Sequence, residues 1–115
     1  MSAPIAFIDL QAQRRRLGAP LEAAIAAAVE GGQWILGPQV TQLEKDLAAF
    51  AGVKHAIGCA NGTDALLLVL RAWGVGPGDA VFVPAFTFAA SAEVVALAGA
   101  SPVFVDVLPD TFNMD

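Results

Sequence analysis

The stretch from Ala80 to Val105 carries a single charged residue, Glu93. A segment this apolar either crosses a membrane as one helix or is buried inside a folded protein. In a membrane, Glu93 would lie near the centre of the bilayer, which costs roughly 2.5 kcal/mol or more. Pro84 and Pro102 bracket the segment, and its ends are rich in Val and Phe. We therefore predict a strand, a helix and a second strand here, and no membrane span.

Prolines and glycines divide the rest of the chain into short elements. Pro20 and Pro38 suit the first turns of two helices, of which Gly31 and Gly32 would end the first and Gly52 the second. The predicted order is an extended arm over residues 1–10, these two helices, and then strands at 55–59, 80–83 and 103–107 with helices between them. Alternating strands and helices indicate an α/β fold with a parallel sheet and right-handed crossovers. Continuously apolar strands indicate a sheet that is covered on both faces.

The composition is unusually apolar for a chain of 115 residues, which is enough for one domain or part of one. Hydrophobic residues make up 57% and charged residues 15%, against about 25% charged in an average soluble domain. A small domain has much surface to cover with polar groups. We therefore expect some of this surface to be buried by further chain, by a second subunit, or by both.

The charge and cysteine content exclude several classes of function. A net charge of −5 argues against nucleic acid as a partner, and we expect the run Arg14–Arg16 to be a solvated face at the entry to a helix. The only cysteine, Cys59, cannot form an internal disulfide, and we expect it to be a small core residue. The only histidine, His55, is expected at the surface, and no metal site is expected. The first seven residues lack the features of a signal peptide, which fits the cytoplasm.

The turn after the first predicted strand could bind an anion. Gly62 allows a sharp turn into a helix, and Thr63 and Asp64 follow at the helix start, where backbone N–H groups have no partner within the helix. These donors and the positive end of the helix dipole favour a phosphate. Ordinary capping by Asn61 or Thr63, with nothing bound, is the alternative. Spacing alone favours capping, because short motifs often match by chance.

A second segment of interest follows the next predicted strand, where Phe86 and Phe88 flank Thr87. Ligands of open parallel sheets bind at the carboxyl ends of the strands. An aromatic ring at such an end can lie against a flat heterocycle, or it can be part of the core. We expect Phe86 in the core, and the residues alone leave both readings open for Phe88.

Taken together, the motifs resemble the DegT/DnrJ/EryC1/StrS family of pyridoxal 5'-phosphate (PLP)-dependent sugar-nucleotide aminotransferases. The order and spacing agree along the whole chain, and the matching segments are Phe7–Leu10, Trp34–Pro38, Asn61–Leu66, Gly74–Asp79, Phe86–Glu93 and Gly99–Asp106. Within the family, the chain is most similar to enzymes that aminate the keto group of UDP-2-acetamido-2-deoxy-3-keto-glucuronic acid for surface-polysaccharide synthesis.

This resemblance implies the start of a fold type I, aspartate-aminotransferase-like enzyme. Residues 1–54 would be an arm and two helices, and residues 55–115 would begin the PLP-binding large domain. Thr63 and Asp64 would bind the PLP phosphate through their backbone amides, and Gly62 would permit its close approach. Phe88 would stack on the pyridine ring. The segment Trp34–Pro38 would lie near the active-site entrance.

The resemblance also implies catalytic residues that these 115 residues do not supply. The family's Schiff-base lysine and the aspartate that pairs with the pyridine nitrogen are expected beyond Asp115, since neither Lys45 nor Lys54 occupies a suitable position. We expect a homodimeric protein that takes its amino group from glutamate. Two alternatives stay open: a sugar-nucleotide dehydratase of the same family, and a non-catalytic fragment.

Overall fold

The computed structural model describes residue 5 and residues 7–115. These residues form two compact units, Met1–Gly58 and Cys59–Asp115. Among them, no helix has both the length and the apolar character that a membrane span requires.

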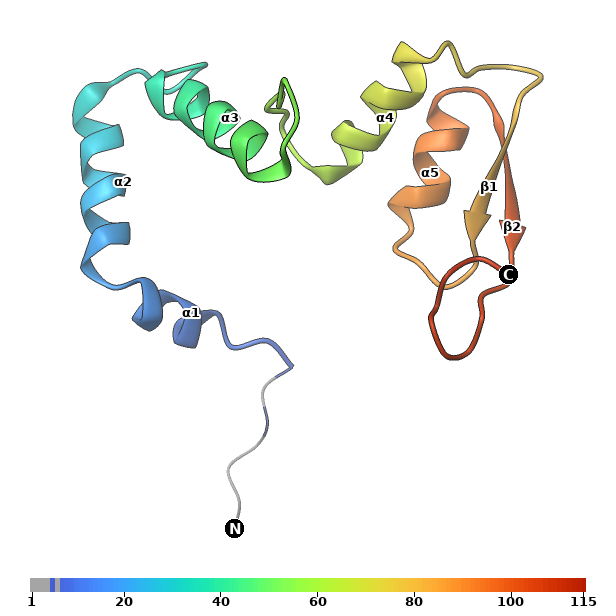
Figure 1. Ribbon diagram of the computed structural model, residues 1–115, viewed down its shortest axis with the longest axis horizontal. Coiled ribbons are helices and arrows are strands. Elements are labelled where there is room, and N and C mark those ends of the chain that lie inside the picture. The colour runs from blue at the N-terminus through green and yellow to red at the C-terminus, as the bar shows by residue number, and fades with distance from the viewer. Residues whose placement is uncertain (1–4, 6) are drawn as a thin grey trace. The chain divides into compact units, whose positions relative to one another are not determined.

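The first unit consists of three helices, α1 (Leu10–Leu17), α2 (Ala19–Gly31) and α3 (Pro38–Ala51) (Figure 1). Helices α2 and α3 follow the predicted boundaries. Each has a proline in its first turn. Each is followed by a glycine in the left-handed conformation, Gly32 with φ 62° and Gly52 with φ 65°, which a residue without Cβ adopts at little cost.

Helix α1 was not predicted from the sequence. Its start is capped by Asp9, whose side chain accepts a hydrogen bond of 2.9 Å from the backbone N–H of Ala12. The run Arg14–Arg16 forms its last turn and is exposed, as predicted. Of the predicted extended arm, residues 1–4 and 6 lie outside the described residues.

The second unit contains α4 (Gly62–Ala72), β1 (Ala80–Pro84), α5 (Ala90–Leu97) and β2 (Ser101–Val105). The two strands pair in parallel, with Ala80 opposite Ser101 and Pro84 opposite Val105. The strand, helix and strand predicted for residues 80–105 are therefore confirmed, and so is the α/β class. Strand β2 begins and ends two residues earlier in the sequence than the predicted 103–107. Its residues Ser101 to Val105 pair with Ala80 to Pro84 of β1, and the pairing stops where β1 ends.

The predicted strand at residues 55–59 is wrong, since the described residues give it no strand partner and no strand conformation. A strand needs a neighbouring ladder to satisfy its backbone groups. The backbone N–H of Gly58 is bonded instead to the Glu44 side chain, at 2.7 Å, and Ile57 is 85% exposed. The described sheet thus has two strands.

A small core holds the second unit together where α5 packs on the sheet and on α4. Its buried members are Val83, Val94, Val95 and Ala100. Burying each valine side chain contributes about 1.5–3 kcal/mol. Among the described residues one face of the sheet is left uncovered, since Phe82 on β1 is 64% exposed.

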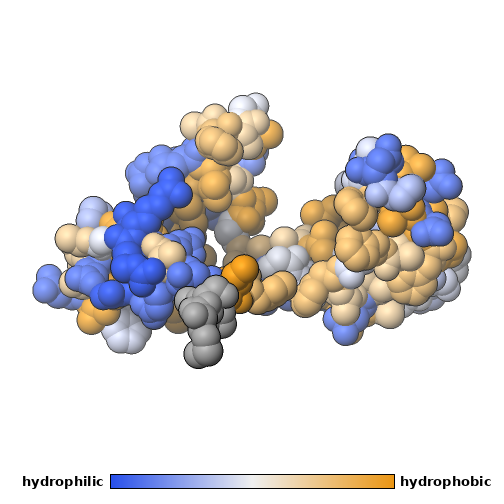
Figure 2. Space-filling model, turned by 90° about the horizontal axis from the view of Figure 1, so that it is seen from below, coloured by the Kyte–Doolittle hydropathy of each residue, from blue (hydrophilic) through white to orange (hydrophobic). Residues whose placement is uncertain are grey.

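Much apolar surface lies outside this core, as the composition predicted. Figure 2 shows apolar residues over a large part of the visible surface. In the second unit the exposed large apolar side chains include Leu68, Trp73, Phe82, Phe86, Phe88, Leu97 and Phe104.

Candidate functional site

The start of α4 is capped by Asn61. Its backbone is extended, and its side-chain Oδ1 accepts a hydrogen bond of 2.9 Å from the backbone N–H of Asp64. Its backbone carbonyl accepts another, of 3.1 Å, from the N–H of Ala65. The capping by Asn61 that the sequence offered as an alternative is therefore present.

Capping does not use every donor of the first turn. The backbone N–H groups of Gly62 and Thr63 have no hydrogen-bond partner among the described residues. A Cβ atom added to Gly62 would meet nothing within 4 Å, so the space beside this glycine is open. Two free amides at the positive end of a helix, with the Thr63 hydroxyl beside them, form a donor set suited to an anion.

Asp64 also lies in the first turn of α4, but its backbone N–H already donates to the Asn61 side chain. Its carboxylate Oδ2 also accepts a hydrogen bond of 3.2 Å from the Asn61 Nδ2 atom. A carboxylate in the first turn stabilises a helix through the dipole, but it repels a second anion. Donation by the Asp64 amide to a phosphate would require the Asn61 cap to open, and this role stays a prediction.

The second segment presents Phe88 at the start of α5. The Phe88 side chain is 78% exposed. Its backbone carbonyl accepts a hydrogen bond of 3.0 Å from the N–H of Ser91, and the hydroxyl oxygens of Thr87 and Ser91 are 2.9 Å apart. The residue pattern did not predict this hydroxyl pair, although two hydroxyl residues four positions apart at a strand-to-helix junction could have suggested it.

The prediction that Phe86 belongs to the core is wrong. Phe86 is 69% exposed, and its ring packs against Phe112 with centroids 5.3 Å apart. The chain turns away from the sheet immediately after β1, where the Ala85 N–H donates to the Val105 carbonyl at 2.8 Å. The side chain that follows therefore leaves the core.

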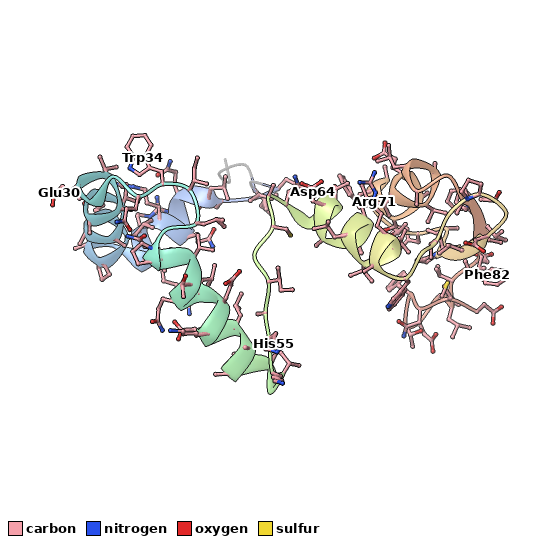
Figure 3. All side chains as sticks on the ribbon, turned by 90° about the horizontal axis from the view of Figure 1, so that it is seen from above. Glu30, Trp34, His55, Asp64, Arg71 and Phe82 are labelled. Atoms are coloured by element: carbon pink, nitrogen blue, oxygen red, sulfur yellow. The ribbon has the colours of Figure 1, made fainter. Side chains whose placement is uncertain are left out.

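Both segments lie at one end of the second unit. Figure 1 shows the amino ends of α4 and α5 and the carboxyl ends of β1 and β2 pointing the same way. The contacts between α4 and α5 make the two helices neighbours. Figure 3 shows Asp64 at the beginning of α4 and Arg71 near its other end. This end of a parallel sheet is where ligands of open α/β folds bind.

Other candidate residues offer less chemistry. Lys45 on α3 and Lys54 after it are both exposed, whereas a Schiff-base lysine is activated by desolvation or by a neighbouring cation. His55 is exposed as predicted, and Glu93 is exposed on α5. Cys59 is exposed, so its predicted core position is wrong. The reason is that the segment leading to it joins no sheet.

The Trp34–Pro38 segment belongs to the first unit, where Trp34 is 75% exposed and Ile35 is 90% exposed. Its predicted place near an active-site entrance stays a prediction. Among the described residues, no group of three His, Cys, Asp or Glu side chains could hold a metal ion.

Comparison with known proteins places these features in a family. Residues 16–115 match the model of the DegT/DnrJ/EryC1/StrS aminotransferase family. A UDP-2-acetamido-2-deoxy-3-oxo-D-glucuronate aminotransferase from Pseudomonas aeruginosa is 55% identical over 111 residues, which are 96% of this chain and 31% of that protein. The chain thus spans less than a third of the length of this relative.

Solved structures agree with the sequence match. A DegT DnrJ EryC1 StrS aminotransferase from Brucella abortus superposes with a TM-score of 0.92 at 60% identity, over 97% of this chain and 30% of that one. The PLP form of Spr1654 from Streptococcus pneumoniae superposes with a TM-score of 0.75 at 42% identity, over 82% of this chain and 25% of that one. The resemblance read from the sequence is confirmed, and the chain belongs to the DegT/DnrJ/EryC1/StrS aminotransferase family.

Proposed function

We propose that this chain supplies the cofactor-phosphate-binding part of a PLP-dependent aminotransferase that acts on a keto sugar nucleotide. One observation carries the proposal: Gly62 and Thr63 present unpaired backbone N–H groups at the start of α4, beside open space. Family membership and the PLP form of a structural neighbour support the same cofactor.

The residues present fit the two chemical parts of PLP. Its phosphate needs several hydrogen-bond donors and a positive potential, which the Gly62 and Thr63 amides and the α4 dipole provide. Its flat pyridine ring needs an aromatic or apolar surface, and Phe88, which is 78% exposed, directly precedes Ala89, the N-cap residue of α5. No positively charged side chain is needed at this position, because the amides of a helix start suffice.

These residues bind and orient, and they do not move protons. When bound, the cofactor supplies the electron sink for amino transfer. Gly62 and Thr63 would hold the phosphate, and Phe88 would cover one face of the ring and keep water from it. Lys45 and Lys54 are exposed in the first unit, so we propose that the lysine that carries the proton lies elsewhere in the protein.

The substrate proposal rests on the relatives. The Pseudomonas aeruginosa relative is named for a UDP-linked 3-oxo sugar acid, and we propose a substrate of this class, with glutamate as the amino donor and a homodimer as the working form. Two further relatives are also named for nucleotide sugars, one for a UDP-linked 3-dehydro sugar and one for a dTDP-linked 3-amino sugar.

The test is a pair of half-reactions with the protein expressed from its complete reading frame. Glutamate should convert the absorbance band of the bound aldehyde cofactor to that of its amine form. A UDP-linked 3-keto sugar acid should then restore the first band, and the unoxidised 3-hydroxy sugar should not. Absence of the first conversion with glutamate and other common amino donors would refute an aminotransferase. Conversion without restoration by any keto sugar nucleotide would refute the substrate class.

A further inference from the structure

We infer that Thr87 and Ser91 are positioning residues that restrain the direction in which the Phe88 side chain leaves the backbone, an inference that rests on the proposed stacking role of Phe88. Their hydroxyl oxygens lie 2.9 Å apart, which is a hydrogen bond. A second hydrogen bond, of 3.0 Å, joins the Ser91 N–H to the Phe88 carbonyl. Phe88 thus lies between two residues, Thr87 and Ser91, that are joined by a side-chain hydrogen bond, and its own carbonyl is hydrogen-bonded to the second of them.

The ends of this segment are anchored as well. The Ala85 N–H donates to the Val105 carbonyl at 2.8 Å, which ties the exit of β1 to the end of β2. On the other side, Ala90 is 5% exposed and belongs to the buried face of α5. Between these anchors, the Thr87–Ser91 bond restrains the backbone on both sides of Phe88 and with it the direction of the Phe88 Cα–Cβ bond.

In the part of the chain that the structure describes, packing does not fix this ring. Phe88 is 78% exposed, and among the described residues its ring has no aromatic partner. Phe86 is different, because its ring is held by Phe112. An exposed aromatic side chain without packing samples several rotamers, so the backbone sets only the direction of the Phe88 Cα–Cβ bond and the range that the ring can reach.

The hydroxyl pair lies at the start of α5, where no side chain caps the helix. Helix α5 has Ala89 as its N-cap residue and no side-chain cap hydrogen bond. The Thr87 hydroxyl bonds to the Ser91 hydroxyl and not to a backbone N–H of the first turn. The pair therefore does not cap the α5 amides. It restrains the residues on either side of Phe88 instead, as a positioning role requires.

The test compares Thr87→Val and Ser91→Ala with Thr87→Ser, which keeps the hydroxyl, in the protein expressed from its complete reading frame. Ser101→Ala, at the amino end of β2, is the matched control for loss of a serine hydroxyl. The readouts are the visible circular dichroism of bound PLP, which reports how the cofactor is held, and the dissociation constant for PLP. We expect the first two variants to lose at least about half of the dichroism and to bind PLP about three- to tenfold more weakly, the loss expected for one hydrogen bond.

Thr87→Ser and Ser101→Ala should match the wild type in both readouts. The double variant Thr87→Val/Ser91→Ala should be no worse than either single variant, because both changes remove the same hydroxyl bond. Should one single variant not fold, the other tests the same bond.

Three outcomes separate the inference from the function it rests on. Wild-type dichroism and affinity in Thr87→Val and Ser91→Ala, with or without a lower melting temperature, would overturn the positioning role. The same result together with a large loss in Phe88→Leu would overturn the inference alone. If Phe88→Leu itself changes neither readout, the proposed stacking role fails, and the inference fails with it.

Discussion

The side-chain Oδ1 of Asn61 accepts a hydrogen bond of 2.9 Å from the backbone N–H of Asp64, while the Asn61 Nδ2 donates to the Asp64 carboxylate at 3.2 Å. These two hydrogen bonds join the N-cap residue of α4 to a residue of its first turn. They take one amide out of the donor set and leave those of Gly62 and Thr63 free among the described residues. Capping and anion binding are therefore compatible at this helix start, because they use different amides.

Loss of the cap should destabilise the protein. Asn61→Ala removes the side-chain acceptor for the Asp64 N–H and should lower the free energy of unfolding by about 1 kcal/mol. Asn61→Ser keeps a capping oxygen and should lose much less. Urea denaturation of the three proteins measures the difference, and equal midpoints for Asn61→Ala and wild type would contradict the capping role.

The core of the second unit gives a second stability prediction. Val95 is 1% exposed, whereas Leu97 on the same helix is 62% exposed. Val95→Ala should cost about 2 kcal/mol through lost burial and a residual cavity. Leu97→Ala should stay within about 0.5 kcal/mol of wild type. Similar losses for both variants would show that α5 is covered on its outer side in the folded protein.

The two lysines should not form the cofactor imine. When PLP is mixed with this 115-residue chain and reduced with borohydride, mass spectrometry should find no stoichiometric adduct on Lys45 or Lys54. Both side chains are exposed, whereas a Schiff-base lysine is activated by desolvation or by a neighbouring cation. A stable imine absorbance band that disappears in Lys45→Arg or Lys54→Arg would contradict this prediction.

Local signals in the sequence were enough for α2, α3, α5 and the paired strands, but not for α1. Proline at a first turn and glycine beyond the last turn set the bounds of α2 and α3, since both residues act through their own backbone restrictions. The apolar stretch around Glu93 predicted β1, α5 and β2. Its prolines and its single charge are compatible with a buried strand, helix and strand but not with one membrane-spanning helix.

Features that depend on distant partners could not be predicted. Whether residues 55–59 form a strand depends on a neighbouring strand, which their own sequence does not encode. Cys59 and Phe86 were expected to be buried because of their residue types, but both follow points where the chain leaves the packed layers. The Thr87–Ser91 hydroxyl bond, by contrast, is local, and the spacing of the two hydroxyl residues at a strand-to-helix junction could have suggested it.

The central claim is that the free amides at the start of α4 bind a phosphate, and Gly62→Pro tests it most directly. Proline is tolerated at the first position of a helix and lacks the N–H, and the extended backbone of Asn61 suits a residue that precedes proline. Gly62→Ala is the matched control, because it keeps the N–H and its Cβ would meet nothing within 4 Å.

The measurement is the dissociation constant for PLP, with pyridoxal as the ligand without phosphate, in the protein expressed from its complete reading frame. Gly62→Pro should bind PLP about tenfold or more weakly, the loss expected for one hydrogen bond to a charged group. Gly62→Ala adds a Cβ at the same position but keeps the N–H, so it should bind PLP more tightly than Gly62→Pro, and neither change should affect pyridoxal. Wild-type affinity for PLP in a folded Gly62→Pro protein would contradict the account.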